Sequence, residues 1–256
     1  MMYWSDNVKT EAFVAVPKSS GGYPLFVSCH GGYDTSVDET HVASPTSAMD
    51  LEYAQSGFIT LIPEYRGYAN SGGTVPDFNG ITLDTNNAIK AIQSHFQVEP
   101  NHIYLEGASM GGGVVLKLAT ERNDIRSVIA ISPFVGWDEE GKWAVSAKKQ
   151  NPRALSEYNA MVDHYGPFKP NSPTYEKESI DYTKIHVPAL ILQGTDDANV
   201  EWQTVQLFYN DLKPTDSYAK LILFPGGHHG LHGKYQQAVN KDISEWYTKY
   251  GEGASF

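Results

Sequence analysis

A serine flanked by two glycines is the residue of this chain best placed to do chemistry. Ser109 lies in the pattern Gly-x-Ser-x-Gly, with apolar residues before it at 103–105 and an apolar run after it at 114–119. This context predicts a strand, a sharp turn that carries Ser109 and a helix whose N-terminus lies behind the hydroxyl. Gly107 and Gly111 fit this turn because a Cβ at either position would clash with the crossing strand or helix.

Residues that could activate such a serine follow two later predicted strands. Two adjacent aspartates, Asp196 and Asp197, follow one strand, and two adjacent histidines, His228 and His229, follow the next. The hydroxyl of Ser109 needs an imidazole to accept its proton, and the imidazole needs a carboxylate to fix its tautomer. The chain order serine, aspartate, histidine is that of an α/β-hydrolase.

Strand and helix patterns alternate along the chain. Apolar or alternating runs predict strands at 8–16, 25–29, 58–62, 102–105, 127–131, 189–192 and 221–224. Helical patterns occupy residues 44–55, 81–96, 110–121, 202–212 and 235–250. The order predicts a single α/β domain over residues 1–256, with a mostly parallel, doubly wound sheet and helices on both faces. In such a sheet the loops at the carboxyl ends of the strands collect ligands.

The stretch from Trp137 to Lys184 interrupts this alternation with aromatic, charged and proline residues. We interpret it as a small, partly helical lid or cap that leaves the sheet at the same carboxyl edge as Ser109 and covers it. Six aromatic residues are candidates to line an acyl pocket: Tyr33, which is adjacent to Gly32, and Trp137, Trp143, Tyr158, Tyr165 and Phe168 of this stretch. Some aromatic residues of the stretch must instead pack it onto the sheet, and the sequence does not separate the two groups.

Five segments together resemble the α/β-hydrolase fold and, within it, the catalytic domain of the prolyl-oligopeptidase family and its esterase relatives. The segments are His-Gly-Gly at 30–32, Pro-Glu-Tyr-Arg-Gly at 63–67, Gly-Ala-Ser-Met-Gly-Gly at 107–112, Leu-Gln-Gly-Thr-Asp-Asp-Ala-Asn-Val at 192–200 and His-Gly at 229–230. The resemblance covers most of the chain. These motifs are specific for the fold and the catalytic triad, and much less specific for the substrate.

The resemblance implies a role for particular residues. The family's acid lies three residues after a glycine and three before a valine, which selects Asp197 over its neighbour. The family's histidine directly precedes a glycine, which selects His229. Ser109 would then be the nucleophile, and the backbone N–H groups of Gly32 and Met110 would form the oxyanion hole.

The resemblance leaves several functions open. Prolyl oligopeptidases carry a β-propeller before the catalytic domain, and this chain begins almost at that domain. We therefore expect a carboxylesterase that acts on small acyl or aryl esters through an acyl-enzyme. The first alternative is a compact peptidase or amidase with the same machinery. The second, from another class, is a catalytically silent binding protein with a hydrolase fold.

Two further groups of residues have both a chemical and a structural interpretation. His228, His229 and His232 could bind a metal, but no carboxylate or cysteine at ligand spacing accompanies them, so we expect neither a metal nor another cofactor. Arg66 could bind a substrate carboxylate, although such an arginine more often forms a structural ion pair. His30 could line the site, and a structural role is the commoner one.

Composition restricts the partners and the compartment. A net charge of −11 argues against nucleic acid or an anionic membrane as a partner. The partner that the resemblance implies is a small ester substrate. Cys29 is the single cysteine of the chain, so no intramolecular disulfide can form, as expected in a reducing compartment. The sequence has no apolar run of signal-peptide or transmembrane length, and we expect a cytoplasmic location.

Overall fold

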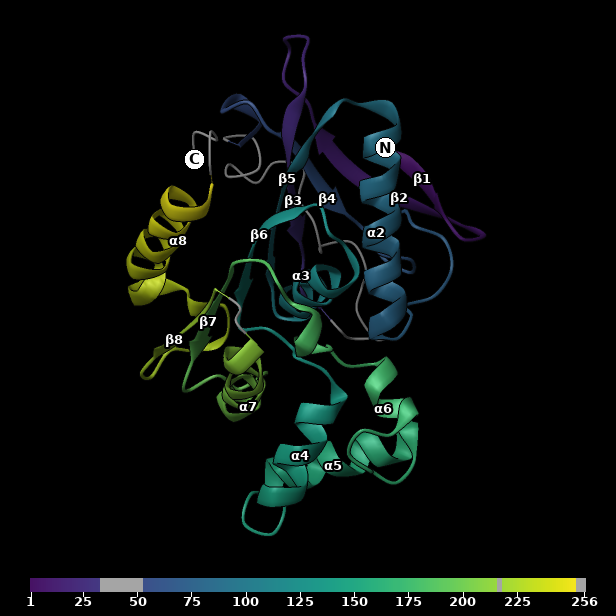
Figure 1. Cartoon of the computed structure of the whole chain (residues 1–256). Coiled ribbons are helices and arrows are strands. Elements are labelled where there is room, and N and C mark those ends of the chain that lie inside the picture. Colours follow the sequence, from purple (N-terminus) through teal and green to yellow (C-terminus); the bar gives the residue numbers. More distant parts are fainter. Residues whose placement is uncertain (33–52, 216–217, 252–256) are drawn as a thin grey trace.

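The computed structural model describes residues 1–32, 53–215 and 218–251, which include an eight-stranded sheet (Figure 1). The strands are β1 (Met2–Ser5), β2 (Val8–Ala15), β3 (Tyr23–Cys29), β4 (Ile59–Pro63), β5 (Val98–Ala108), β6 (Ile125–Ile131), β7 (Ala189–Gly194) and β8 (Ala219–Phe224). Their order across the sheet is β1-β2-β4-β3-β5-β6-β7-β8. β2 pairs antiparallel with β1 and β4, and every other pair is parallel. The predicted mostly parallel α/β sheet is confirmed.

Helices connect the strands, as the sequence predicts. They are α2 (Phe78–His95), α3 (Met110–Glu121), α4 (Trp137–Ala147), α5 (Pro152–Tyr165), α6 (Pro173–Lys177), α7 (Trp202–Leu212) and α8 (Gln236–Tyr250). Nearly all of the helix predicted at 44–55 lies outside the described residues. Sequence analysis missed β1, a four-residue edge strand too short for a periodic pattern. Within the described residues, no helix is long and apolar enough to cross a membrane.

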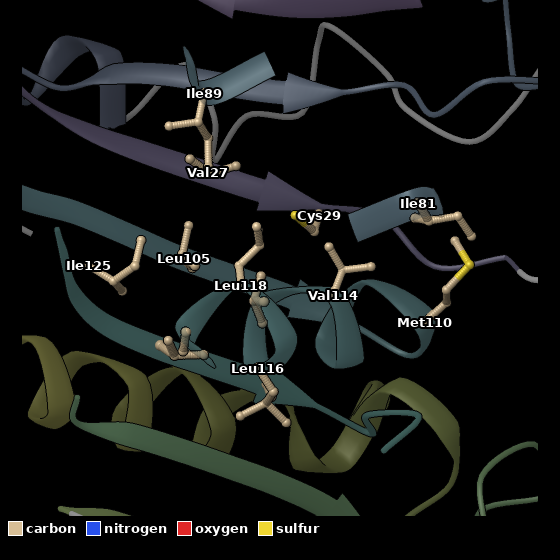
Figure 2. Packing of buried hydrophobic residues seen from close by; sticks show 14 of the residues in the cluster. Val27, Cys29, Ile81, Ile89, Leu105, Met110, Val114, Leu116, Leu118 and Ile125 are labelled. Atoms are coloured by element: carbon tan, nitrogen blue, oxygen red, sulfur yellow. The ribbon is translucent and has the colours of Figure 1, made fainter. Parts of the chain in front are cut away.

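The sheet carries apolar side chains on both faces, and different helices cover the two faces. Leu25 and Val27 of β3 belong to a buried cluster that includes residues of α2, α3 and α7. Phe26, between them, belongs to a second cluster that includes residues of α8. Figure 2 shows the first cluster around α3. This alternation is the expected pattern for a strand covered on both faces, and it places α3 directly behind the ends of β3 and β5.

Residues 137–184, here called the cap segment, form α4, α5, α6 and a 3-10 turn. In Figure 1 the three helices lie together beyond one end of the sheet. α4 and α5 pack around the buried Trp143 and Ala154. The ammonium of Lys117 on α3 donates to the carbonyl oxygens of Lys177 (2.9 Å) and Ser179 (2.7 Å). These contacts fix the end of the cap segment to the helix that follows Ser109.

Candidate active site

Ser109 occupies the turn between β5 and α3 with φ 57° and ψ −122°, a strained conformation for a residue with a side chain. Its N–H donates to the carbonyl of Ile131 at 2.8 Å, and its carbonyl accepts from the N–H of Phe134 at 3.0 Å. Both partners belong to the end of β6 and the loop that follows it. The neighbouring strand therefore holds the turn on both sides of the serine.

Close backbone packing explains the glycines around Ser109. A Cβ on Gly107 would lie 2.3 Å from the carbonyl oxygen of Gly111, and a Cβ on Gly111 would lie 2.1 Å from the carbonyl oxygen of Cys29. Both distances are far below a permissible contact, as the sequence led us to expect. A Cβ on Gly31 would lie 3.0 Å from the Cβ of Ser109, so the His-Gly-Gly loop runs directly against the turn.

Asp197 and His229 meet at the ends of β7 and β8. Nδ1 of His229 lies 2.9 Å from Oδ2 and 3.0 Å from Oδ1 of Asp197. The side chain of Asp197 is fully buried, whereas that of His229 is 26% exposed. Burial alone would raise the pKa of Asp197. The hydrogen bonds from His229 and from the N–H groups of Val200 (2.9 Å) and Asn199 (2.8 Å) outweigh burial and lower it.

The adjacent pair His228 and Asp196 has a different environment. Nδ1 of His228 lies 3.0 Å from the carbonyl oxygen of Asp196, and the side chains of the two residues are 77% and 72% exposed. The two neighbouring histidines therefore contact two neighbouring aspartates. Only the pair formed by His229 and Asp197 combines a direct side-chain hydrogen bond with a buried carboxylate.

Ser132 links the histidine loop to the end of β6. Its Oγ accepts the N–H of Gly230 at 3.1 Å, and its own N–H donates to the carbonyl of Leu192 at 2.7 Å. Ser132 is fully buried and has a positive φ of 47°. The segment after β6 thus contacts both the turn of Ser109 and the loop of His229, which fixes the position of one loop relative to the other.

A cavity of about 690 Å³ opens at this edge of the sheet. It is lined by Gly31, Gly32, Ala108, Ser109, Met110, Phe134, Trp137, Glu140, Arg153, Glu157, Asn199, Val200, His229, Gly230 and His232. The structure therefore gathers Ser109, His229, Gly32 and Met110 around one space, with Asp197 hydrogen-bonded to His229. The volume suits a small organic ligand.

Comparison with known proteins shows the family of this chain. The family model described as the prolyl oligopeptidase family matches residues 45–253. The chain belongs to the prolyl oligopeptidase family. The uncharacterized peptidase YtmA of Bacillus subtilis (strain 168) is 23% identical over 246 residues, which are 95% of this chain and 90% of that protein. The family predicted from the five motifs is confirmed.

Solved structures share the fold of this prolyl oligopeptidase family member. Acylaminoacyl peptidase of Pyrococcus horikoshii superposes with a TM-score of 0.76 at 18% identity, over 98% of this chain and 41% of that chain. The propionate-bound esterase Est2 of Thermogutta terrifontis superposes with a TM-score of 0.68 at 19% identity, over 98% and 93%. The fold is thus common to a peptidase and an esterase. Family and fold together make this chain a hydrolase of the serine peptidase or esterase type.

The aromatic residues suggested for the pocket lie in several places. Trp137 lines the cavity, while Tyr33 lies outside the described residues. Trp143 is buried between α4 and α5, and the ring of Tyr158 packs against that cluster. Tyr165 contacts the ring of Trp137, with the ring centroids 5.7 Å apart. Among the residues described, the cavity lining includes none of these last three.

Phe168 likewise packs inside the cap segment. Its ring lies 5.0 Å from that of Tyr175, and a Cβ on Gly141 would lie 2.1 Å from it. The lining of the described cavity does not include Phe168. The aromatic residues of the cap segment therefore mainly join its helices to one another, and Trp137 is the aromatic contribution of the segment to the described cavity.

Three charged residues of the cap segment line the cavity, and sequence analysis did not single them out: Glu140 on α4, and Arg153 and Glu157 on α5. Nη1 of Arg153 lies 3.3 Å from a carboxylate oxygen of Glu201 and 3.4 Å from the carbonyl oxygen of Asp197. Burial, followed by the negative charge of Glu157, raises the pKa of Glu140 to about 8. Helical spacing is the sequence signal that could have found them. Glu140 lies three residues after Trp137, and Glu157 lies four residues after Arg153, so each pair shares a helix face.

The backbone of the His-Gly-Gly loop is held from behind by two tyrosines. The hydroxyl of Tyr65 donates to the carbonyl of His30 at 3.0 Å, and that of Tyr68 donates to the carbonyl of Gly32. Nε2 of His30 lies 3.5 Å from the buried carboxylate of Glu64. Burial lowers the pKa of His30 to about 4 and raises that of Glu64 to about 7. The side chain of His30 therefore packs behind the backbone of its own loop, which is the structural role.

Arg66 forms a structural ion pair rather than a substrate contact. Its Nε donates to Oδ1 of Asp84 at 2.9 Å, and its backbone N–H donates to Oδ2 at 2.9 Å. Asp84 is fully buried on α2. The pair joins the loop after β4 to α2, and Arg66 is not among the described residues that line the cavity.

Proposed function

We propose that this chain is a carboxylesterase that hydrolyses small acyl or aryl esters through an acyl-enzyme. Ser109 is the nucleophile, His229 is the general base and acid, and Asp197 orients His229. The backbone N–H groups of Gly32 and Met110 stabilise the oxyanion. The observation that carries the proposal is one cavity lined by both Ser109 and His229, with Nδ1 of His229 2.9 Å from the buried carboxylate of Asp197.

The hydrogen bond to Asp197 determines what His229 can do. The pKa of Asp197 is lowered, so its carboxylate is an acceptor and Nδ1 of His229 carries the proton. Nε2 is then the basic nitrogen and takes the proton of Ser109 as Oγ attacks the ester carbonyl carbon. The oxyanion that forms receives hydrogen bonds from the two backbone N–H groups.

The remaining steps use the same groups. The tetrahedral intermediate collapses as its bond to the alcohol oxygen breaks, and His229 returns the proton to that oxygen. Ser109 is left acylated. Water then attacks the acyl carbonyl while His229 accepts its proton, and a second collapse frees the acid and restores Ser109.

The size of the cavity favours a small ester over a peptide. The cap segment and the strand-end loops together line a cavity of about 690 Å³, which suits a small acyl or aryl group. A compact peptidase is the second candidate, and it is favoured by the match to the uncharacterized peptidase YtmA over 95% of this chain.

Labelling of Ser109 tests the proposal directly. We expect a fluorophosphonate to modify Ser109 and to abolish ester hydrolysis. Ser109→Ala should lower kcat by roughly 10³-fold or more, with an unchanged melting temperature, because the hydroxyl supports no packing. Labelling or activity that persists in this variant would contradict the assignment. A parent chain that resists the reagent would instead favour a silent binding protein.

Matched substrates separate the two hydrolase candidates. Rates are measured for an aryl ester and for the anilide with the same acyl group. We expect the ester to be hydrolysed while the anilide is not, because an amine leaving group requires protonation in the transition state. Comparable kcat/KM values for the two would support a peptidase or amidase.

A further inference from the structure

The side chain of Gln193, one residue before the end of β7, contacts the carboxylate of Asp197. Nε2 of Gln193 lies 3.1 Å from Oδ2 of Asp197, 3.0 Å from the carbonyl oxygen of Gly194 and 3.3 Å from that of Val200. Gln193 is fully buried. One amide group therefore contacts both the carboxylate and the backbone of the loop that carries it.

The chemistry of these partners fixes the orientation of the amide. Two are carbonyl oxygens, and the third is a carboxylate whose pKa is lowered, so all three only accept hydrogen bonds. Turning the Gln193 amide over would place its oxygen against these acceptors. In the observed orientation Oε1 has no hydrogen-bond partner among the described residues. A buried acceptor without a donor is unfavourable, so the contacts of Nε2 must outweigh this cost.

Gln193 holds the oxygen of Asp197 that the main chain does not hold. Oδ1 accepts the N–H groups of Asn199 and Val200, which fix one side of the carboxylate. Oδ2 accepts from Nε2 of Gln193 and is the oxygen nearer Nδ1 of His229, at 2.9 Å. Rotation of the carboxylate away from His229 would break the hydrogen bond to Gln193.

We propose that Gln193 is a positioning residue that orients the carboxylate of Asp197 toward His229 and limits how strongly that carboxylate favours the protonated imidazole. The proposal rests on the proposed function of Ser109, His229 and Asp197. Each hydrogen bond that the carboxylate accepts spreads its negative charge. With Gln193 in place, the carboxylate therefore stabilises the protonated imidazole less strongly than it would otherwise.

Gln193→Met removes the donor and keeps a side chain of similar length. We expect kcat to fall by roughly tenfold, with KM changed by less than about twofold, because orientation is lost and substrate contacts are kept. The rising limb of the pH–rate profile should move to higher pH by about half a unit, because the less solvated carboxylate favours the protonated imidazole.

Gln193→Glu gives a second variant whose effect depends on pH. A protonated glutamic acid can donate to Asp197 as the amide does, whereas an ionised one adds negative charge beside His229. We expect rates close to the parent at acidic pH and a larger alkaline displacement of the rising limb.

Gln203→Met is the matched control, since Gln203 on α7 also has a buried, unpartnered Oε1 and no hydrogen bond to Asp197 among those found in the structure. It should keep the parent profile.

A result in the unmodified protein completes the test. The side-chain amide protons of Gln193 should titrate in NMR spectra with the same midpoint as the rate, because protonation of His229 changes the charge next to Asp197. Lost stability with an unshifted profile in both Gln193 variants would overturn the proposal, as would an amide that does not titrate. An inactive, unlabelled parent would reject the proposed function instead, and the amide titration would still report on the hydrogen bond.

Discussion

The cavity has two walls that are built in different ways. The strand-end wall consists of the loops after β3, β5, β6, β7 and β8, and backbone contacts fix it, such as the 2.1 Å approach that excludes a Cβ at Gly111. The helical wall consists of α4 and α5 and presents side chains: Trp137, Glu140, Arg153 and Glu157. Every residue of the proposed mechanism lies on or behind the strand-end wall. We therefore expect the strand-end wall to perform the chemistry and the helical wall to select the substrate.

Histidine substitutions should give the largest contrast. His229→Ala should lower kcat by roughly 10³-fold or more, since the proposed mechanism assigns the proton of Ser109 to His229. His228→Ala should change kcat by less than about twofold, because His228 is 77% exposed and its partner Asp196 is also at the surface. Steady-state rates on one aryl ester measure both effects. Equal losses would show that the strand-end wall does not distinguish the two histidines.

Aspartate substitutions should give the next largest contrast. Asp197→Asn should lower kcat by roughly 10²- to 10⁴-fold, because a neutral amide cannot stabilise the protonated imidazole and can reverse its tautomer. Asp196→Asn should leave kcat nearly unchanged, since its carboxylate is 72% exposed. The two variants are compared at the pH of maximum rate. A severe effect at position 196 would reverse the assignment of the acid.

Tryptophan substitutions should sharpen the contrast within the helical wall. Trp137→Ala should change the preference for bulky over short acyl esters by about tenfold in kcat/KM, because Trp137 lines the cavity. Trp143→Ala should lower stability by about 3–5 kcal/mol and keep the order of preference, because Trp143 is buried between helices. A substrate panel and melting curves measure the two effects. Unaltered preference in the Trp137 variant would limit the helical wall to a packing role.

The charge of the helical wall should give the smallest effect. The pKa of Glu140 is raised to about 8, mainly by burial, so this carboxyl is neutral below that pH and ionised above it. The ratio of kcat/KM for a cationic ester to that for its neutral isostere should therefore rise about threefold as the pH passes 8. Glu140→Gln should give a flat ratio. A rise that survives in this variant would have another source.

The two walls also differ in how far the sequence predicts them. The strand-end wall depends on short motifs in which adjacent residues are fixed by a turn, so the positions of Ser109 and Gly111 follow from local sequence. The motif spacing of the family selects His229 over His228 and Asp197 over Asp196. In the structure, His229 and Asp197 are joined by a hydrogen bond, and the carboxylate of Asp197 is buried. The substitutions at positions 229 and 197 test their catalytic roles.

The lining of the helical wall depends on which face of each helix turns toward the cavity. The composition of residues 137–184 does not predict that face. Trp137 and Trp143 both lie on α4, yet Trp143 packs against α5 and Trp137 lines the cavity. Gln193 shows the same limit within a recognised motif. Nothing in the segment 192–200 tells which side chain reaches the carboxylate, because that contact depends on how the loop folds back.

The base of the cap segment is closed. Gly136 and Ser179 form an antiparallel bridge, the N–H of Trp137 donates to the carbonyl of Glu178 at 3.3 Å, and the N–H of Asp138 donates to Oγ of Ser179 at 2.9 Å. Entry and exit of the helices are therefore adjacent, as in an insertion at a single loop of the sheet. Such an insertion can be exchanged or lengthened as one unit while β6 and β7 keep their register. We therefore expect an exchange of residues 137–178 to replace the side chains of the helical wall while the strand-end wall is kept.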